Sequence, residues 1–97
     1  MSKKIKAYLQ ITMDIDNENR GTAATVYTRF KEPFLESVPG ALSKDLLIRD
    51  EDVQVLHGFD SYKNAEAYLS SDLFKNDVFS GLKGLWKKDP EIRIYNL

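Results

Sequence analysis

The stretch that decides the fold is ALSKDLLIRDEDVQVLHGF, residues 41–59. Its second half, residues 53–59, alternates between two faces as a half-buried strand does, and one face carries Val53, Val55, His57 and Phe59. Its first half, residues 41–49, alternates imperfectly. Because the charged triplet Asp50-Glu51-Asp52 separates the two halves, the stretch predicts two antiparallel strands joined by a turn.

The chain before this hairpin predicts one strand and one helix. Residues 4–13, KIKAYLQITM, place Ile, Ala, Leu and Met at every second position, which is typical of a strand. Residues 14–21 are polar and turn-rich, so they predict a loop. Thr22 is then expected to cap a helix that runs to about Val38 and is kinked at Pro33.

The chain after the hairpin predicts helical segments and a last strand. Asp60 or Ser61 is expected to cap the first of these helices. Ser71 is expected to cap a second helical piece that ends near Lys88. Residues 91–97, EIRIYNL, alternate again and predict a strand.

The order strand, helix, strand, strand, helix, strand predicts a ferredoxin-like α+β fold, with an antiparallel sheet and its helices on one face. We expect residues 1–97 to form a single domain. The other face of the sheet is then uncovered, and its side chains are mixed and partly aromatic: Tyr8, Gln10, Thr12, Gln54, Leu56, Arg93 and Tyr95. Such a face predicts a homodimer in which a second copy covers it.

The composition excludes several classes of function. The chain has 14 basic and 15 acidic residues, so we expect neither nucleic acid nor a membrane surface as a partner. It contains no cysteine, which excludes disulfides, thiolate nucleophiles and cysteine-based metal sites and is compatible with the cytoplasm, where we expect the protein. No apolar run approaches the roughly 20 residues that span a bilayer.

One polar stretch has a superficial likeness to a calcium loop. Asp14, Asp16 and Glu18 recur at every second position. However, an EF-hand needs glycine at its sixth position and glutamate at its twelfth, where this chain has Asn19 and Thr25. We therefore expect a solvated loop and no metal.

Several local motifs carry a family resemblance. They are Pro39-Gly40-Ala41-Leu42 before the second strand, the turn Arg49-Asp50-Glu51-Asp52, Phe59-Asp60-Ser61-Tyr62 at the start of a helix, and AEAYLSSDLF over residues 65–74. With the element order, these motifs resemble the antibiotic biosynthesis monooxygenase family. The resemblance covers nearly the whole chain and is densest over residues 38–97.

The resemblance implies a homodimeric α+β barrel in which each subunit has a cavity between its sheet and its helices. Members of the family include cofactor-free oxygenases of phenols, quinol oxygenases and haem-degrading enzymes. The haem-degrading members have an iron-ligating histidine at the position of Val78. Because valine cannot bind iron, we expect no haem and no other cofactor.

Two residues are candidates for catalysis. Many family members have histidine where this chain has Tyr68; a tyrosine there is a poor base near neutral pH but can donate a hydrogen bond. His57 is the chain's only histidine and could take a proton from a phenol. The alternative, which its apolar neighbours in the strand favour, is a structural histidine bonded to a backbone carbonyl.

Four aromatic residues are candidates for binding a flat substrate: Tyr27, Phe30, Phe74 and Trp86. Their spacing on the predicted helices is equally consistent with core packing, which is the more frequent role of such residues.

Two functional hypotheses result. The first is a cofactor-independent monooxygenase that acts on a small phenol or quinol. The second is a non-catalytic dimeric protein that binds a small aromatic molecule or serves as a stress-related accessory protein.

Overall fold

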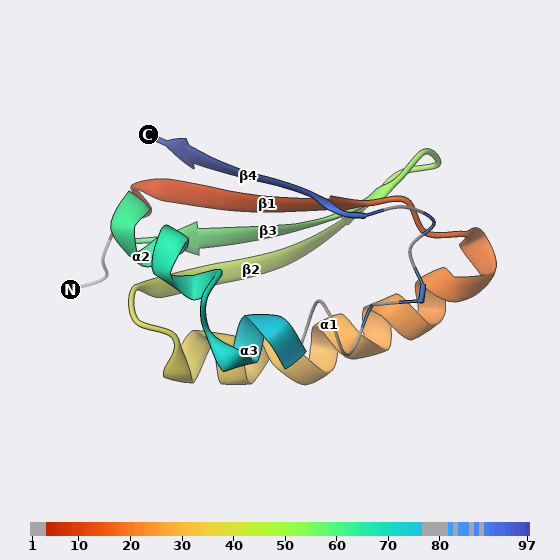
Figure 1. Cartoon of the computed structure of the whole chain (residues 1–97), viewed down its shortest axis with the longest axis horizontal. Helices are drawn as coiled ribbons and strands as arrows, with labels where there is room; N and C mark the ends of the chain where they lie inside the picture. The colour runs from red at the N-terminus through yellow and green to blue at the C-terminus, as the bar shows by residue number, and fades with distance from the viewer. Residues whose placement is uncertain (1–3, 77–81, 83, 86, 88) are drawn as a thin grey trace.

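The computed structural model describes residues 4–76, 82, 84, 85, 87 and 89–97 of the chain (Figure 1). In chain order its elements are β1 Ala7–Met13, α1 Asn17–Ser37, β2 Ala41–Ile48, β3 Val53–Phe59, α2 Tyr62–Tyr68, α3 Asp72–Phe74 and β4 Glu91–Asn96. The predicted ferredoxin-like α+β order is therefore confirmed.

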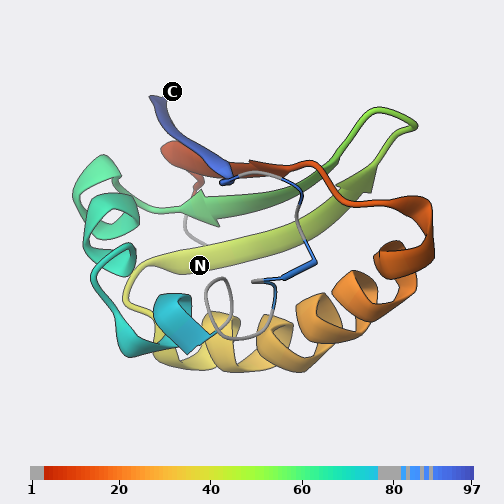
Figure 2. The ribbon, with the colours of Figure 1, turned by 45° about the vertical axis from the view of Figure 1, so that its right-hand side comes forward.

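The four strands form one antiparallel sheet in the order β2-β3-β1-β4. In the middle of this sheet, Leu9 of β1 lies opposite both His57 of β3 and Ile94 of β4. The helices lie on one side of the sheet, with α1 running along its length, and the opposite side is open (Figures 1 and 2). The uncovered sheet face that the sequence predicts is thus present in the single chain.

Strict alternation in the sequence accounts for the core. Every second residue of β1, from Ala7 to Met13, is buried, and the residues between them are half-buried. The same phase in β3 buries Val53, Val55, His57 and Phe59. Together with apolar side chains from the helices, these residues form one hydrophobic layer between sheet and helices.

The first helix begins earlier than the sequence suggests. It starts at Asn17 rather than after Thr22, so the predicted loop is wrong for residues 17–21. Tertiary contacts explain the difference, because Ile15 just before the helix is only 1% exposed and the side chain of Arg20 anchors the first turn. The helix also continues through Pro33 to Ser37, with the proline on its exposed side.

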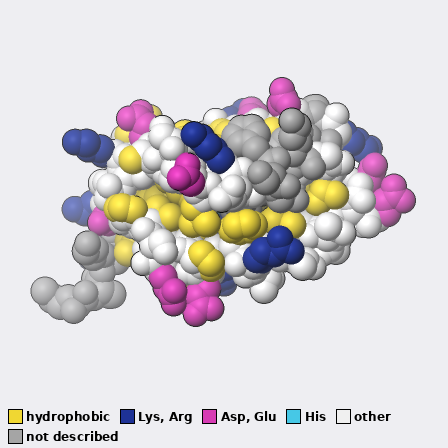
Figure 3. All heavy atoms as spheres, turned by 60° about the horizontal axis from the view of Figure 1, so that its bottom comes forward, with side chains coloured by type: hydrophobic (Ala, Val, Ile, Leu, Met, Phe, Trp, Pro, Cys, Tyr) yellow, Lys and Arg dark blue, Asp and Glu magenta, His cyan; other side chains and the backbone are white. Residues whose placement is uncertain are grey.

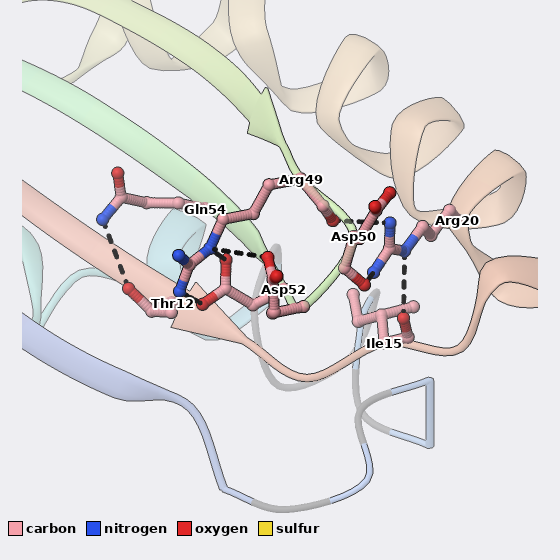
Figure 4. Close-up of polar contacts among 8 residues, drawn as sticks. Thr12, Ile15, Arg20, Arg49, Asp50, Asp52 and Gln54 are labelled. Carbon is pink, nitrogen blue, oxygen red and sulfur yellow. Dashed lines mark hydrogen bonds and ion pairs between the residues drawn. The ribbon is translucent and has the colours of Figure 1, made fainter.

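Arg20 connects three segments through its guanidinium (Figure 4). Its Nε donates to the carbonyl of Ile15 at 3.1 Å, and its terminal nitrogens donate to the carbonyls of Arg49 at 2.7 Å and Asp50 at 2.9 Å. The start of α1 is thereby tied to the turn between β2 and β3. Within that turn, Arg49 also forms an ion pair with Asp52 at 2.7 Å.

Both serine caps that the sequence predicts are confirmed. The hydroxyl of Ser61 accepts from the amide of Asn64 at 3.1 Å, at the start of α2. The hydroxyl of Ser71 accepts from the amide of Phe74 at 3.1 Å, at the start of α3. The two caps start two separate short helices, as the sequence predicts.

The second helical piece does not extend to Lys88 as predicted. Helix α3 is assigned over Asp72–Phe74, and the described residues Leu82, Gly84, Leu85 and Lys87 lie in turns and bends. Gly84 has a φ of +93°, a conformation that ends a right-handed helix and that glycine adopts without strain. The remaining residues of this stretch, 77–81, 83, 86 and 88, lie outside the described part of the chain.

Within the described residues, none of the helices combines the length and the apolar character that crossing a membrane requires.

The Arg20 contacts generate a prediction about stability. Replacing Arg20 with methionine removes three hydrogen bonds to carbonyls and should lower the free energy of unfolding by about 1–2 kcal/mol. Urea denaturation measures this change. The matched control is Arg29→Met, at an exposed position of the same helix, which should change stability by less than about 0.5 kcal/mol. Equal effects of the two substitutions would contradict an anchoring role for Arg20.

Candidate functional site

His57 lies on the inner face of β3, in the middle of the sheet. It pairs with Leu9 of β1 on one side and with Lys44 of β2 on the other, and it is 1% exposed. Its Nδ1 is 3.2 Å from the carbonyl oxygen of Leu9. Because a carbonyl only accepts hydrogen bonds, Nδ1 carries the proton and Nε2 is left as an acceptor.

The surroundings of His57 keep it neutral. Burial and the nearby charge of Lys44 lower its pKa to about 3, against the smaller opposing effect of the hydrogen bond to Leu9. Among the described residues, Nε2 is buried without a hydrogen-bond partner. The sequence also allowed a structural histidine that is bonded to a backbone carbonyl. Such a bond is present at Nδ1, but it does not account for the buried Nε2.

Phe34 and Tyr68 contact this imidazole, and Phe59 and Phe74 pack against those two rings. We call the five rings the aromatic cluster: Phe34, His57, Phe59, Tyr68 and Phe74. The ring of Phe34 lies 5.0 Å from His57, 5.1 Å from Tyr68 and 5.5 Å from Phe59, each time edge to face. Tyr68 lies 5.4 Å from both His57 and Phe74. The structure thus brings together both predicted catalytic residues and one predicted substrate-binding residue, Phe74.

An apolar pocket of about 290 Å³ adjoins the cluster. We call it the Tyr68 pocket; its lining consists of Ser37, Val38, Pro39, Asn64, Ala67, Tyr68, Ser71 and Leu73. It lies where the end of α1 meets α2 and α3, on the helical side of the molecule, where Figure 3 shows a band of hydrophobic side chains. Its volume is at the lower end of the range for ligand sites, so it suits a small molecule.

The predicted substrate-binding residues Tyr27, Phe30 and Phe74 do not line this pocket themselves. Tyr27 is half-buried on α1, and its hydroxyl donates to the carbonyl of Lys44 at 2.6 Å. Phe30 packs against the edge of the core. Trp86 lies outside the described residues, as does Val78 at the position of the family's haem ligand.

Sequence reasoning missed two residues of this region. Lys44 is 1% exposed, and its Nζ lies 5.5 Å from the ring centre of Phe34 and 5.8 Å from that of Tyr27. It pairs with His57 and therefore lies on the inner face of the sheet. The imperfect alternation of β2 does not indicate this position. The second is Phe34, a buried residue of α1, whose position at the centre of the cluster depends on contacts between distant parts of the chain.

The described residues include no group of three or more histidine, aspartate or glutamate side chains arranged to hold a metal ion. Asp16, one of the carboxylates of the apparent calcium loop, instead pairs with the ammonium of Lys87 at 2.8 Å.

The fold is shared with solved structures of similar length. A conserved protein from Methanosarcina mazei Go1 aligns with a TM-score of 0.79 at 18% identity, over 95% of this chain and 92% of that one. A "Putative antibiotic biosynthesis monooxygenase" from Nitrosomonas europaea aligns with a TM-score of 0.77 at 12% identity, over 100% of this chain and 95% of that one. A further structure, named an antibiotic biosynthesis monooxygenase, aligns with a TM-score of 0.73 at 12% identity, over 94% and 97%.

These likenesses confirm the ferredoxin-like α+β fold of the single chain. No protein-family model matches the sequence, and no curated protein matches it significantly. At these identities the comparisons establish the architecture, and the chemistry must be argued from the site itself.

The lowered pKa of His57 predicts how stability depends on pH. Its pKa is about 3 in the folded chain against an ordinary value of 6.5, so between these values the unfolded chain binds a proton that the folded chain does not. The titration of His57 therefore leaves the free energy of unfolding unchanged above about pH 6.5. Below that pH it lowers the free energy of unfolding by about 1.4 kcal/mol per pH unit, until the pH approaches 3. Urea unfolding at several pH values between 7 and 4 measures this slope.

The control for this measurement is His57→Gln, which removes the titrating group but keeps a polar side chain. Carboxylates contribute to the slope in both proteins, so the difference between the two slopes isolates His57. Parallel pH profiles would show that His57 titrates normally in the folded chain.

Proposed function

We propose that this chain is a cofactor-independent monooxygenase that binds a small phenol or quinol in the Tyr68 pocket. The observation that carries this proposal is the apolar pocket of about 290 Å³ whose wall, Tyr68, contacts the buried and neutral His57 at a ring distance of 5.4 Å. A fold shared with proteins named as monooxygenases supports it.

The proposed reaction needs no external reductant. A quinol and O2 give a hydroxyquinone and water: one oxygen atom enters the ring, the other leaves as water, and the quinol supplies all four electrons. The task of the protein is to hold the substrate in a dry site and to provide one or two hydrogen bonds.

We assign the roles of the residues from their positions. Tyr68 contacts the substrate and donates a hydrogen bond to the oxygen that accumulates charge. His57 receives the proton that the hydroxyl of the quinol releases as the quinol is oxidised. Phe74 packs on Tyr68 at 5.4 Å and so fixes the inner wall of the pocket.

A second copy of the chain is the proposed partner. The open face of the sheet has a hollow of about 400 Å³, and two side chains of this face on the edge strands, Leu47 and Tyr95, are each 45% exposed. On the same face the amide of Gln54 donates to the hydroxyl of Thr12 at 3.2 Å (Figure 4). Exposed apolar side chains on an uncovered sheet face are suited to burial against a second copy.

One observation favours the second hypothesis, a protein that binds an aromatic molecule without turnover. The pKa of His57, lowered to about 3, makes it a weak base toward a phenol in its ground state. A ligand that raises the melting temperature while no oxygen is consumed would identify this function.

Oxygen consumption tests the enzymatic proposal. A panel of small quinols incubated aerobically with the protein should consume oxygen above the buffer rate, and Tyr68→Phe should lower kcat/KM roughly 100-fold because a hydrogen-bond donor is lost. The matched control is Tyr62→Phe, at the 41% exposed start of α2, which should leave the rate unchanged. Absence of turnover with every quinol would reject the enzymatic proposal.

Sedimentation tests the dimer. At micromolar concentration the chain should sediment as a dimer, and Leu47→Asp, which places a charge on the open face opposite Gln54, should shift it to monomer. Leu35→Asp, at a 38% exposed position on α1, serves as the control and should leave the dimer intact. A wild-type chain that sediments as a monomer would contradict the proposal.

A further inference from the structure

We propose that His57 Nε2 selects the ligand by accepting a hydrogen bond from it, so that the site binds an aromatic molecule carrying a hydroxyl group in its neutral, hydrogen-donating form. This inference rests on the proposed function, because the ligand enters through the same Tyr68 pocket.

The orientation of the imidazole supports this assignment. Nδ1 donates to Leu9 on the neighbouring strand at 3.2 Å, which fixes both the tautomer and the plane of the ring. Nε2 is farther from the backbone than Nδ1, so it projects from the sheet into the aromatic cluster. There the rings of Phe34 and Tyr68 lie 5.0 and 5.4 Å from the imidazole centre.

The burial of Nε2 makes it selective. Buried polar atoms are normally hydrogen-bonded, yet this acceptor has no partner among the described residues. Its lone pair can be satisfied by an O–H or N–H group but repels an anionic oxygen. A hydroxyl is therefore favoured over a methyl group of the same size, which would leave the acceptor unpaired.

Tyr68 determines how a ligand reaches this acceptor. Its side chain lines the pocket, whose lining does not include His57, and its ring contacts that of His57. A small ring that inserts beside or displaces the ring of Tyr68 brings its hydroxyl toward Nε2. Tyr68 is thus a positioning residue in this step as well as a contact of the substrate.

Nitrogen NMR of the wild-type chain tests the inference directly, because His57 is the only histidine. With 15N-labelled histidine, the free protein should show a protonated Nδ1 and an unprotonated Nε2. Phenol should then move the Nε2 resonance upfield with the same saturation midpoint as the methyl signals of Val38 and Leu73 in the pocket. Toluene, which has the same shape without the hydroxyl, should bind at least roughly tenfold more weakly and leave Nε2 unmoved.

A variant provides the matched comparison. His57→Phe retains a ring but removes the acceptor, and it should abolish the difference in affinity between phenol and toluene. The wild-type spectra decide the question even where this variant fails to fold.

Three results would overturn the inference. The first is phenol that saturates the pocket signals without moving Nε2, and the second is a free protein in which Nε2 carries the proton. Either result together with quinol turnover would leave the proposed function standing. The third is a failure of phenol to bind. If, in addition, the protein consumes no oxygen with any quinol, the proposed function is wrong as well.

Discussion

The packing of Phe34 is the interaction on which the rest of the structure depends. This side chain, fully buried on α1, contacts His57 and Phe59 of β3 and Tyr68 of α2, each with its ring edge to face. Such contacts add to the stabilisation from burial alone. Because a single side chain joins the long helix, the sheet and the short helix, the position of the pocket wall is set by the same packing that holds the domain together.

The strands could be predicted from the sequence where their alternation is strict. β1 and β3 show a clean period of two, because one face of each is buried and the other is not. In β2 the polar Lys44 occupies an inner position opposite His57, so the local pattern of polar and apolar residues is ambiguous. Only the pairing of β2 with β3 shows on which face of the sheet Lys44 lies. The start of α1 was missed for a related reason, since Arg20 stabilises it through carbonyls that are 29 and 30 residues away.

The sequence predicted several residues of the candidate site but not how they are arranged in space. Alternation placed His57 on the inner face, helical spacing favoured a core position for Phe74, and the family resemblance pointed to Tyr68. That the two candidate catalytic rings meet at 5.4 Å depends on the break at Ser71, whose hydroxyl donates to the carbonyl of Tyr68 at 2.6 Å. The family resemblance implied a cavity between sheet and helices, whereas the Tyr68 pocket lies at the ends of the helices, beside a layer in which the aromatic cluster packs.

The presence of histidine at position 57 has an energetic consequence that connects stability to function. A leucine there would fill similar space with no polar atom to satisfy, whereas a buried acceptor without a partner costs about 1–3 kcal/mol. In a chain of 97 residues this is a substantial fraction of the total stability. A bound hydroxyl group would offset that cost, and it would stabilise the folded chain only when the ligand is present. The same atom that weakens the empty protein is therefore the one best placed to recognise its ligand.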